Sequence, residues 1–427
     1  MIRVYNSRVL LYKNRVAKTS SVWSFDITGT QWPPVTRTGV GVNFNTPSYI
    51  FIDFGDGTGV HRYDTKVVGS LHGVTFSTGA ATATTYAAYV YQDGRPSTYR
   101  RTVRYIIPEQ LKVQTLSLGS ALALVSQVLR INFSELIGLI NLTLVSTLLQ
   151  GLDDTFLYSR SISYVSFNSA FGTDTKYDGR IPEEMLINKS YTDFTWRAPL
   201  GGKSFNLNNM DKIPLVAGTL TSLDLAVCSI ADTNGSDGSL PANWNQLTKL
   251  TSFNLPQNLW TVPPPVINQI PSITFLSIGS TSLTSWGDLS NLVNLTSWTM
   301  YQGVNLPTAL PAYFLNFKVI KSVNFSNFSK YSTGGYPSSN PAKLDALIAS
   351  IYDFYNVNVA KSGATSLPFR AVTWQFGTSG SSDVPTGVYQ QPAGYNAGIS
   401  NGNPASSKEI LWLLVNQYAC NVVYATS

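Results

Sequence analysis

The chain of 427 residues has few charged side chains, two cysteines and two histidines. Charged residues make up 12% of the sequence, about half of their usual share. Cys228 and Cys420 are too few for a disulfide framework, and His61 and His72 are too few for a zinc site without unusual additional ligands. We therefore expect neither disulfide stapling nor a bound metal.

The sequence also lacks the motifs of common active sites. It has no P-loop, no glycine-rich dinucleotide fingerprint after a strand, no Gly-x-Ser-x-Gly and no His-Glu-x-x-His. The paired carboxylates Asp153-Asp154 and Glu183-Glu184 are adjacent in sequence, so their side chains point to different faces and do not form a general acid–base pair. We expect a protein that is not an enzyme and takes no cofactor.

Long apolar runs and a strong net charge are missing too. The N-terminus has no apolar segment followed by a small-residue cleavage site, which predicts synthesis without a secretory signal peptide. The most apolar stretch, residues 136–152, contains Asn141, Thr143, Ser146 and Gln150, so we expect no membrane span. The net charge of +6 is modest for this length, and we expect no nucleic-acid partner.

What the sequence does contain is a repeated triplet, Φ-x-x-Φ-x-Φ, in which Φ is apolar. It begins nine times, at Val113, Leu139, Ile162, Tyr191, Leu220, Leu250, Ile273, Leu295 and Ile320. Successive copies begin 22 to 30 residues apart, and the residue between the last two apolar positions is always small or polar. Because a strand sends alternate side chains to opposite faces, each copy predicts a short strand with one buried face. The nearly even spacing predicts a solenoid of stacked coils.

This repeat resembles the leucine-rich-repeat motif L-x-x-L-x-L-x-x-N/C/T-x-L. Three copies match its ninth position, with Cys228, Asn258 and Thr281, and residues 238–258 are similar to the plant-type variant. In that family the ninth residue satisfies backbone groups in the turn after the strand. The resemblance implies an α/β leucine-rich-repeat solenoid over residues 109–427, mostly parallel β with short or irregular convex segments.

The first hundred residues have a different pattern. Residues 1–46 alternate apolar and polar side chains, which predicts strands or an extended β arm. Residues 47–108 contain YIFIDFGDGTG and then a hairpin with an Asp-Gly turn at Asp93. This pair resembles a polycystic-kidney-disease-type (PKD) domain, which implies an all-β, immunoglobulin-like sandwich. The turn residues of the first motif are Asp53, Gly55, Asp56 and Gly57, for which a structural turn is favoured over a cation site.

Two helices with capping signals interrupt the last repeats. Asn340-Pro341 has the form of an N-cap followed by proline, and Ser406 with Glu409 forms a capping box. Each helix leads into a further triplet, at residues 369–374 and 420–425. These helix–strand units are expected to close the open end of the core.

The candidate binding residues are aromatic side chains in loops. Tyr389 and Tyr395 lie in the long segment Gly377–Ser407, rich in glycine, serine and asparagine, which is either a binding loop or merely flexible. Trp260 and Tyr301 lie in loops between repeats. By contrast, the expected exposed column of the sheet, which includes Ser166, Thr195, Asp224 and Asn254, has no residue type that usually anchors an interface.

Three functional classes remain. The first is a structural or host-recognition component of a virion (tail, baseplate, fibre or spike), docked to neighbouring subunits through residues 1–46, oligomeric in the particle, and exposing its C-terminal loops to a host receptor or glycan. The second is a secreted bacterial surface adhesin, or a module that binds carbohydrate or protein outside the cell. The third is a carbohydrate-active enzyme, which the missing carboxylate pair disfavours. We expect the first, assembled in the host cytoplasm, because no export signal is evident.

Overall fold

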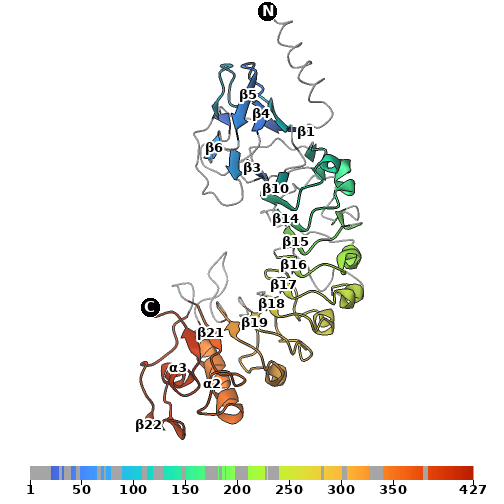
Figure 1. The fold of residues 1–427 in the computed structure, drawn as a ribbon. Coiled ribbons are helices and arrows are strands. Elements are labelled where there is room, and N and C mark those ends of the chain that lie inside the picture. Colours follow the sequence, from blue (N-terminus) through green and yellow to red (C-terminus); the bar gives the residue numbers. More distant parts are fainter. Residues whose placement is uncertain are drawn as a thin grey trace, which may run out of the picture. The chain divides into compact units, whose positions relative to one another are not determined.

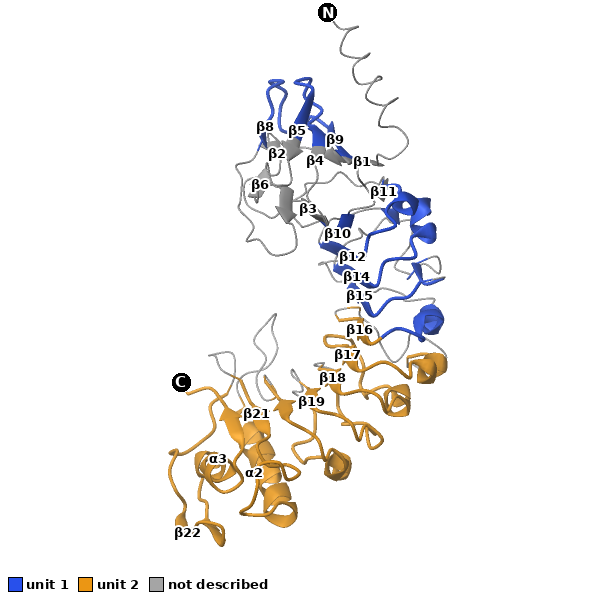
Figure 2. Ribbon diagram, in the orientation of Figure 1, with its two compact units in different colours: residues 1–220 blue, residues 221–427 orange. Residues whose placement is uncertain are grey.

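A computed structural model describes most of the chain. The described residues are 21–27, 31–32, 40–44, 49–64, 69–71, 74–77, 89–107, 113–118, 128–129, 131–145, 151–168, 181, 185–187, 189–197, 210–226, 228, 240–279, 283–300, 305–326, 328, 340–377 and 383–426. They belong to two compact units, residues 1–220 and 221–427, which are shown in different colours in Figure 2. Each unit is described by itself.

The first unit begins with a four-stranded antiparallel sheet in the order β1-β9-β4-β5. Its strands are β1 (Ser21–Ile27), β4 (Tyr49–Asp53), β5 (Val60–Asp64) and β9 (Arg101–Ile107). Trp23, Ile52, Val103 and Tyr105 are fully buried and form the core of this sheet. A small two-stranded sheet joins β2 (Gln31–Trp32) to β8 (Tyr89–Val90).

The described part of the N-terminal segment is not a free arm. Residues 21–27 pair along their whole length with β9, so that Trp23 lies opposite Tyr105. Strand β3 (Val40–Phe44) pairs antiparallel with β10 and parallel with β7 (Val74–Ser77), which in turn pairs with β6 (Gly69–Leu71). Strands on the two sides of the expected boundaries at residues 46 and 108 pair with each other, as β3 does with β10.

The solenoid part of the first unit has one parallel strand per repeat. These strands are β10 (Val113–Leu118), β12 (Asn141–Val145), β14 (Tyr164–Asn168) and β15 (Asp193–Arg197). Their register aligns the apolar residues Leu116, Leu142, Val165 and Phe194, each at most 1% exposed. The convex segments of these repeats, which follow the strands, are short. Three are the 3₁₀ helices η2 (Phe133–Glu135), η3 (Asp154–Tyr158) and η5 (Met210–Val216). In addition, β11 (Val128–Leu129) pairs with β13 (Gly151–Leu152).

The second unit continues the same architecture (Figure 1). Its parallel strands are β16 (Ser222–Asp224), β17 (Ser252–Asn254), β18 (Phe275–Ser277), β19 (Ser297–Thr299), β20 (Ser322–Asn324), β21 (Thr373–Gln375) and β24 (Asn421–Val423). All nine triplets predicted from the sequence thus contain a strand, and the two later triplets supply β21 and β24. This arrangement is a leucine-rich-repeat-like fold.

One row of core side chains crosses the second unit. Leu223, Phe253, Leu276, Trp298, Val323 and Trp374 occupy matching register positions, and all are fully buried. Threonine hydroxyls reinforce the stacking, since Thr251, Thr274 and Thr296 each donate to the backbone carbonyl of the preceding coil's threonine. Each coil alone would leave its apolar face in water, so the strands are stable because they share this core.

The convex segments of the second unit are short helices. The 3₁₀ helices η6 (Ala242–Gln246), η7 (Pro265–Gln269) and η8 (Ala312–Asn316) each follow a proline and turn an apolar residue inward. The two predicted C-terminal helices are confirmed as α2 (Pro341–Asn358), capped by Asn340, and α3 (Ser407–Asn416), capped by Ser406. None of the helices in the described ranges has the length and hydropathy that a membrane span requires.

Candidate functional site

The C-terminal loop that was expected to bind or to be merely flexible is described from residue 383 onward and is tied down at both ends. The Asp383 carboxylate accepts a hydrogen bond from the Asn340 backbone amide (2.9 Å), and the Asp345 carboxylate accepts one from the Thr386 amide (3.1 Å). At the start of α3, the Glu409 carboxylate accepts hydrogen bonds from Gln390 Nε2 (2.8 Å) and the Ala405 amide (2.6 Å). These bonds lower the pKa of Glu409, the Gln390 bond most of all.

A hairpin inside this loop rests on the end of α3. Its strands are β22 (Ala393–Asn396) and β23 (Ser400–Asn403). The buried Gln417 side chain accepts hydrogen bonds from the Tyr395 hydroxyl (3.2 Å) and the Gly398 amide (3.0 Å), and it donates to Asn401 (3.2 Å). Gly402 has a φ of +67°, and a Cβ there would clash with the Ala393 carbonyl. The backbone of the hairpin is therefore fixed before any partner binds.

Tyr389 and Ile399 are exposed on this backbone, and the rings of Tyr395 and Trp412 are partly exposed. Tyr395 packs edge-on against Trp412 of α3, with ring centroids 4.8 Å apart. One turn further along α3, Asn416 donates to the Trp412 carbonyl and also hydrogen-bonds Tyr389, which is 42% exposed. Ile399, at the hairpin turn, is 70% exposed. We call Tyr389, Tyr395, Ile399 and Trp412 the terminal platform.

The platform also borders the end of α2. Lys361 donates to the Ile399 carbonyl (3.3 Å), and Asn401 donates to the Asn356 side chain (3.0 Å). Val357, the residue after Asn356, is 79% exposed. A single exposed apolar residue needs no explanation. Two of them, Val357 and Ile399, near one exposed and two partly exposed aromatic rings are typical of a binding surface.

The other two candidate aromatics do not contribute to this surface. Trp260 is 1% exposed and belongs to the core, so its expected place on a loop surface is wrong. The sequence placed it in a turn but did not give the direction of its side chain. Tyr301 lies outside the described residues.

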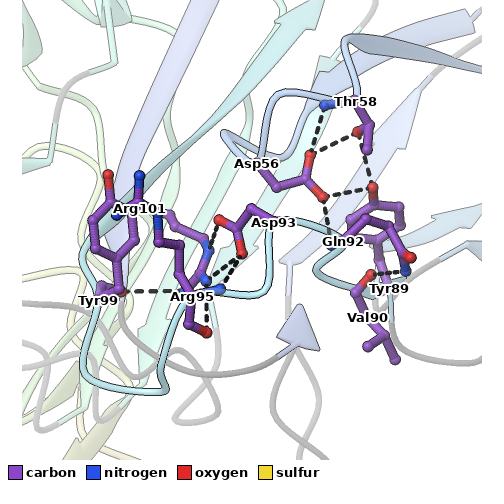
Figure 3. Close-up of polar contacts among 9 residues, drawn as sticks. All are labelled: Asp56, Thr58, Tyr89, Val90, Gln92, Asp93, Arg95, Tyr99 and Arg101. Atoms are coloured by element: carbon purple, nitrogen blue, oxygen red, sulfur yellow. Dashed lines mark hydrogen bonds and ion pairs between the residues drawn. The ribbon is translucent and has the colours of Figure 1, made fainter.

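The turn at Asp53, Gly55, Asp56 and Gly57 is held by hydrogen bonds to its two aspartates. Figure 3 shows those of Asp56. Asp53 accepts a hydrogen bond from the Gly55 amide (2.9 Å). Asp56 accepts bonds from the Thr58 amide and hydroxyl, the Tyr89 hydroxyl (2.8 Å) and the Gln92 amide (3.1 Å). Burial would raise the pKa of Asp56, but these bonds outweigh it and lower the pKa. Both oxygens of the Asp56 carboxylate are thus engaged within the protein.

A buried ion pair lies next to this turn (Figure 3). The fully buried Arg101 guanidinium binds both carboxylate oxygens of Asp93, at 2.7 and 2.9 Å, and stacks over the Tyr91 ring. The paired geometry raises the pKa of Arg101 and lowers that of Asp93. This pair orders the turn at Asp93. The hairpin predicted around this turn is wrong, because β8 pairs with β2 while β9 pairs with β1 and β4.

The ninth positions of two repeats are buried in the second unit. Asn258 is 1% exposed; its amide group donates to the Leu225 and Leu255 carbonyls (3.1 and 2.7 Å) and accepts from the Cys228 backbone amide (3.1 Å). It therefore joins two adjacent coils. Cys228 is a buried free thiol beside the Ala226 carbonyl, and Thr281 lies outside the described residues.

Lys189 is a buried residue that the sequence did not single out. Its ammonium group donates to the Phe156 and Ser159 carbonyls at the end of η3 and lies 4.5 Å from the centre of the Phe156 ring. Burial, and to a lesser degree the charge of Arg160, lowers the pKa of Lys189 to about 8. The lysine satisfies backbone groups of a coil some 30 residues earlier, so no local sequence signal predicts this contact.

The outward-facing column of the sheet is polar in both units, but it is not exposed throughout, because Ser166 and Ser277 are only 8% and 3% exposed. Ser166 and Thr195 are adjacent in the first unit, and in the second unit Asn254 donates to Asp224 (2.8 Å). Two aromatic residues that the sequence analysis did not single out lie on the same face: Tyr164, which is 38% exposed, and Phe275. In the column Asp224 and Asn254 bind each other, whereas in the terminal platform Tyr389 is exposed and the rings of Tyr395 and Trp412 are partly exposed.

Comparisons with known proteins give a partial likeness. No family model matches the sequence, and no curated protein matches it. Solved structures that are similar include internalin C2 of Listeria monocytogenes (15% identity, TM-score 0.29, covering 51% of this chain and 73% of that one) and internalin InlF of the same species (13%, 0.30, 56% and 72%). A leucine-rich-repeat protein of Leptospira interrogans is 16% identical with a TM-score of 0.29, covering 45% of this chain and 50% of that one. Because these identities and TM-scores are low, we assign the fold from the parallel strand register of the chain itself.

Proposed function

We propose that this chain is a non-enzymatic recognition protein whose terminal platform binds an uncharged glycan or protein surface. The observation that carries the proposal is a hydrogen-bonded loop with one exposed and one partly exposed tyrosine and no charged side chain from residue 384 to residue 407. Tyrosine and tryptophan supply large contact areas at a low cost in conformational entropy, and glutamine and asparagine add hydrogen bonds. Because residues 384–407 carry no charge, we expect the loop to bind its partner through ring contacts and hydrogen bonds and not through ion pairs.

The polar side chains of the described residues support a binding role over catalysis. The carboxylates of Asp56, Asp93 and Glu409, whose pKa values are lowered, are all engaged in hydrogen bonds that hold turns or a helix start. Lys189 and Cys420, whose pKa values are shifted by burial, are enclosed in the core. Each of these shifts thus accompanies a structural contact.

We place the protein at a surface outside the cell. The low charge and the high content of serine, threonine, asparagine and tyrosine suit such a location. The N-terminal antiparallel sheet with its Asp-Phe-Gly-Asp-Gly turn suits a PKD-like spacer. Docking of a virion subunit through residues 1–46 has less support, because residues 21–27 pair with β9 of the same chain, and we therefore favour the binding module.

The proposal predicts that the platform residues dominate binding. The full chain is tested on an array of neutral and acidic oligosaccharides and on intact cells treated with protease or periodate. We expect Tyr389→Ala and Trp412→Ala each to weaken binding about tenfold, the usual effect of removing an interface anchor. Loss of binding after protease treatment identifies a protein partner, and loss after periodate identifies a glycan.

The matched control is Asn254→Ala, on the exposed face of the sheet. We expect this variant to bind as the wild type does, since its amide group bonds to Asp224 of the neighbouring strand. If Asn254→Ala abolished binding while the two platform variants retained it, the site would lie on the sheet and the proposal would be wrong.

A further inference from the structure

The core of the second unit is incomplete at strand β24. Along the core row, every residue from Leu223 to Trp374 is fully buried, but Val422, which pairs with Trp374, remains partly exposed. The same difference between β21 and β24 is seen two residues further along, where Phe376 is buried while Tyr424 is partly exposed. Two residues in core positions therefore present apolar surface at the end of the sheet.

The backbone of β24 is open at the same place. Asn421 donates to the Val372 carbonyl (3.0 Å) and Val423 accepts from the Phe376 amide (2.8 Å), so these residues face β21. Because backbone groups alternate along a strand, the N–H and C=O of Val422 point to the opposite edge. In the described part of the chain, β21 is the only strand that pairs with β24.

This edge has none of the features that usually prevent strand pairing. Natural edge strands carry lysine, proline or a bulge that blocks association. The sequence here is Asn421, Val422, Val423 and Tyr424, with Tyr389 6.4 Å from Tyr424, and none of these residues is charged. Close to a two-fold axis a charged residue and its symmetry copy come near each other, so an uncharged edge suits pairing between identical chains.

We propose that β24 pairs antiparallel with β24 of a second copy of this chain about a two-fold axis at Val422. Val422 would exchange both backbone hydrogen bonds with its image, and Asn421 would lie opposite Val423 of the other copy. The contact would cover the exposed parts of Val422 and Tyr424 and continue the sheet from one copy into the next. This proposal does not rest on the terminal platform's binding role, although Tyr389 of the platform lies beside Tyr424.

Sedimentation equilibrium of the full chain tests the proposal. We expect a reversible monomer–dimer equilibrium in the wild type. Val422→Pro removes the outward N–H and leaves the bonds to β21 intact, and proline is tolerated at sheet edges. We expect it to raise the dimer dissociation constant about thirtyfold, the effect of losing two backbone hydrogen bonds, with an unchanged thermal unfolding midpoint.

A second pair of variants reports the register directly. A mixture of Asn421→Cys and Val423→Cys chains should form an intermolecular disulfide, whereas neither variant should do so alone, because residue 421 faces residue 423 across the axis. The native Cys228 and Cys420 are buried. As a control, Val319→Asp, at a 45% exposed site elsewhere in the unit, should leave dimerisation unchanged while Val422→Asp abolishes it. A wild type that stays monomeric at all concentrations, or a dimer that survives Val422→Pro, would overturn the proposal.

Discussion

Replacing Asn258 with alanine is expected to lower the free energy of unfolding by about 3 kcal/mol or more, because it leaves buried backbone groups without partners. The side chain makes three hydrogen bonds, to Cys228, Leu225 and Leu255, and it is 1% exposed. No water reaches these groups easily, so the loss is not compensated. Urea denaturation followed by circular dichroism measures the change.

The matched control for this prediction is Asn254→Ala. Asn254 lies on the exposed face of the sheet, and its side-chain amide donates to Asp224. We expect this substitution to cost less than about 1 kcal/mol. Equal effects of the two substitutions would show that Asn258 does not join the coils as described.

Replacing Trp298 with alanine is expected to cost about 3–5 kcal/mol, the usual range for removing a buried tryptophan. Its ring lies at the centre of the second unit's core, with centroids 5.5 Å from Trp286, 5.8 Å from Phe317 and 5.7 Å from Phe325. Alanine would leave a cavity that these rigid rings cannot fill. The same denaturation measurement applies.

Trp298→Phe tests how much of the cost comes from lost ring volume and how much from the indole N–H. The indole N–H of Trp298 is buried without a hydrogen-bond partner among the described residues. Phenylalanine keeps an aromatic ring and removes this unsatisfied group, so we expect a cost of less than half that of alanine. A phenylalanine variant as unstable as the alanine variant would indicate that the N–H has a partner.

The repeat architecture was predictable because its signals are local. Each triplet contains the alternation of one strand, and its spacing gives the stacking, so the sequence pattern alone assigns Leu223, Phe253 and Leu276 to one row. The role of Asn258 followed from its position in the motif. The helix caps at Asn340 and Ser406 were equally local, because a cap lies within three residues of the group it satisfies.

The features that were missed depend on contacts between distant residues. The pairing of β1 with β9 joins segments about 80 residues apart, and nothing in residues 21–27 specifies the partner. Lys189 binds carbonyls of an earlier coil, and Trp260 turns inward from a loop. Two residues of the terminal platform, Tyr389 and Tyr395, were predicted from the unusual composition of their loop. Trp412 was not predicted. Its signal in the sequence is weaker, because it is an aromatic residue outside the apolar stripe of Ile410, Leu413 and Leu414.

Disulfide trapping of two neighbouring strands tests the stacked-coil register most directly. Ser222 and Ser252 are register partners on the exposed face of β16 and β17. Adjacent strands lie about 4.8 Å apart, within the range that a disulfide spans. Oxidation of the double variant Ser222→Cys/Ser252→Cys should therefore form an intramolecular bond rapidly, while Ser222→Cys/Asn254→Cys, displaced by two residues, should remain reduced. Faster bonding in the displaced pair, or none in either, would contradict the alignment of the coils.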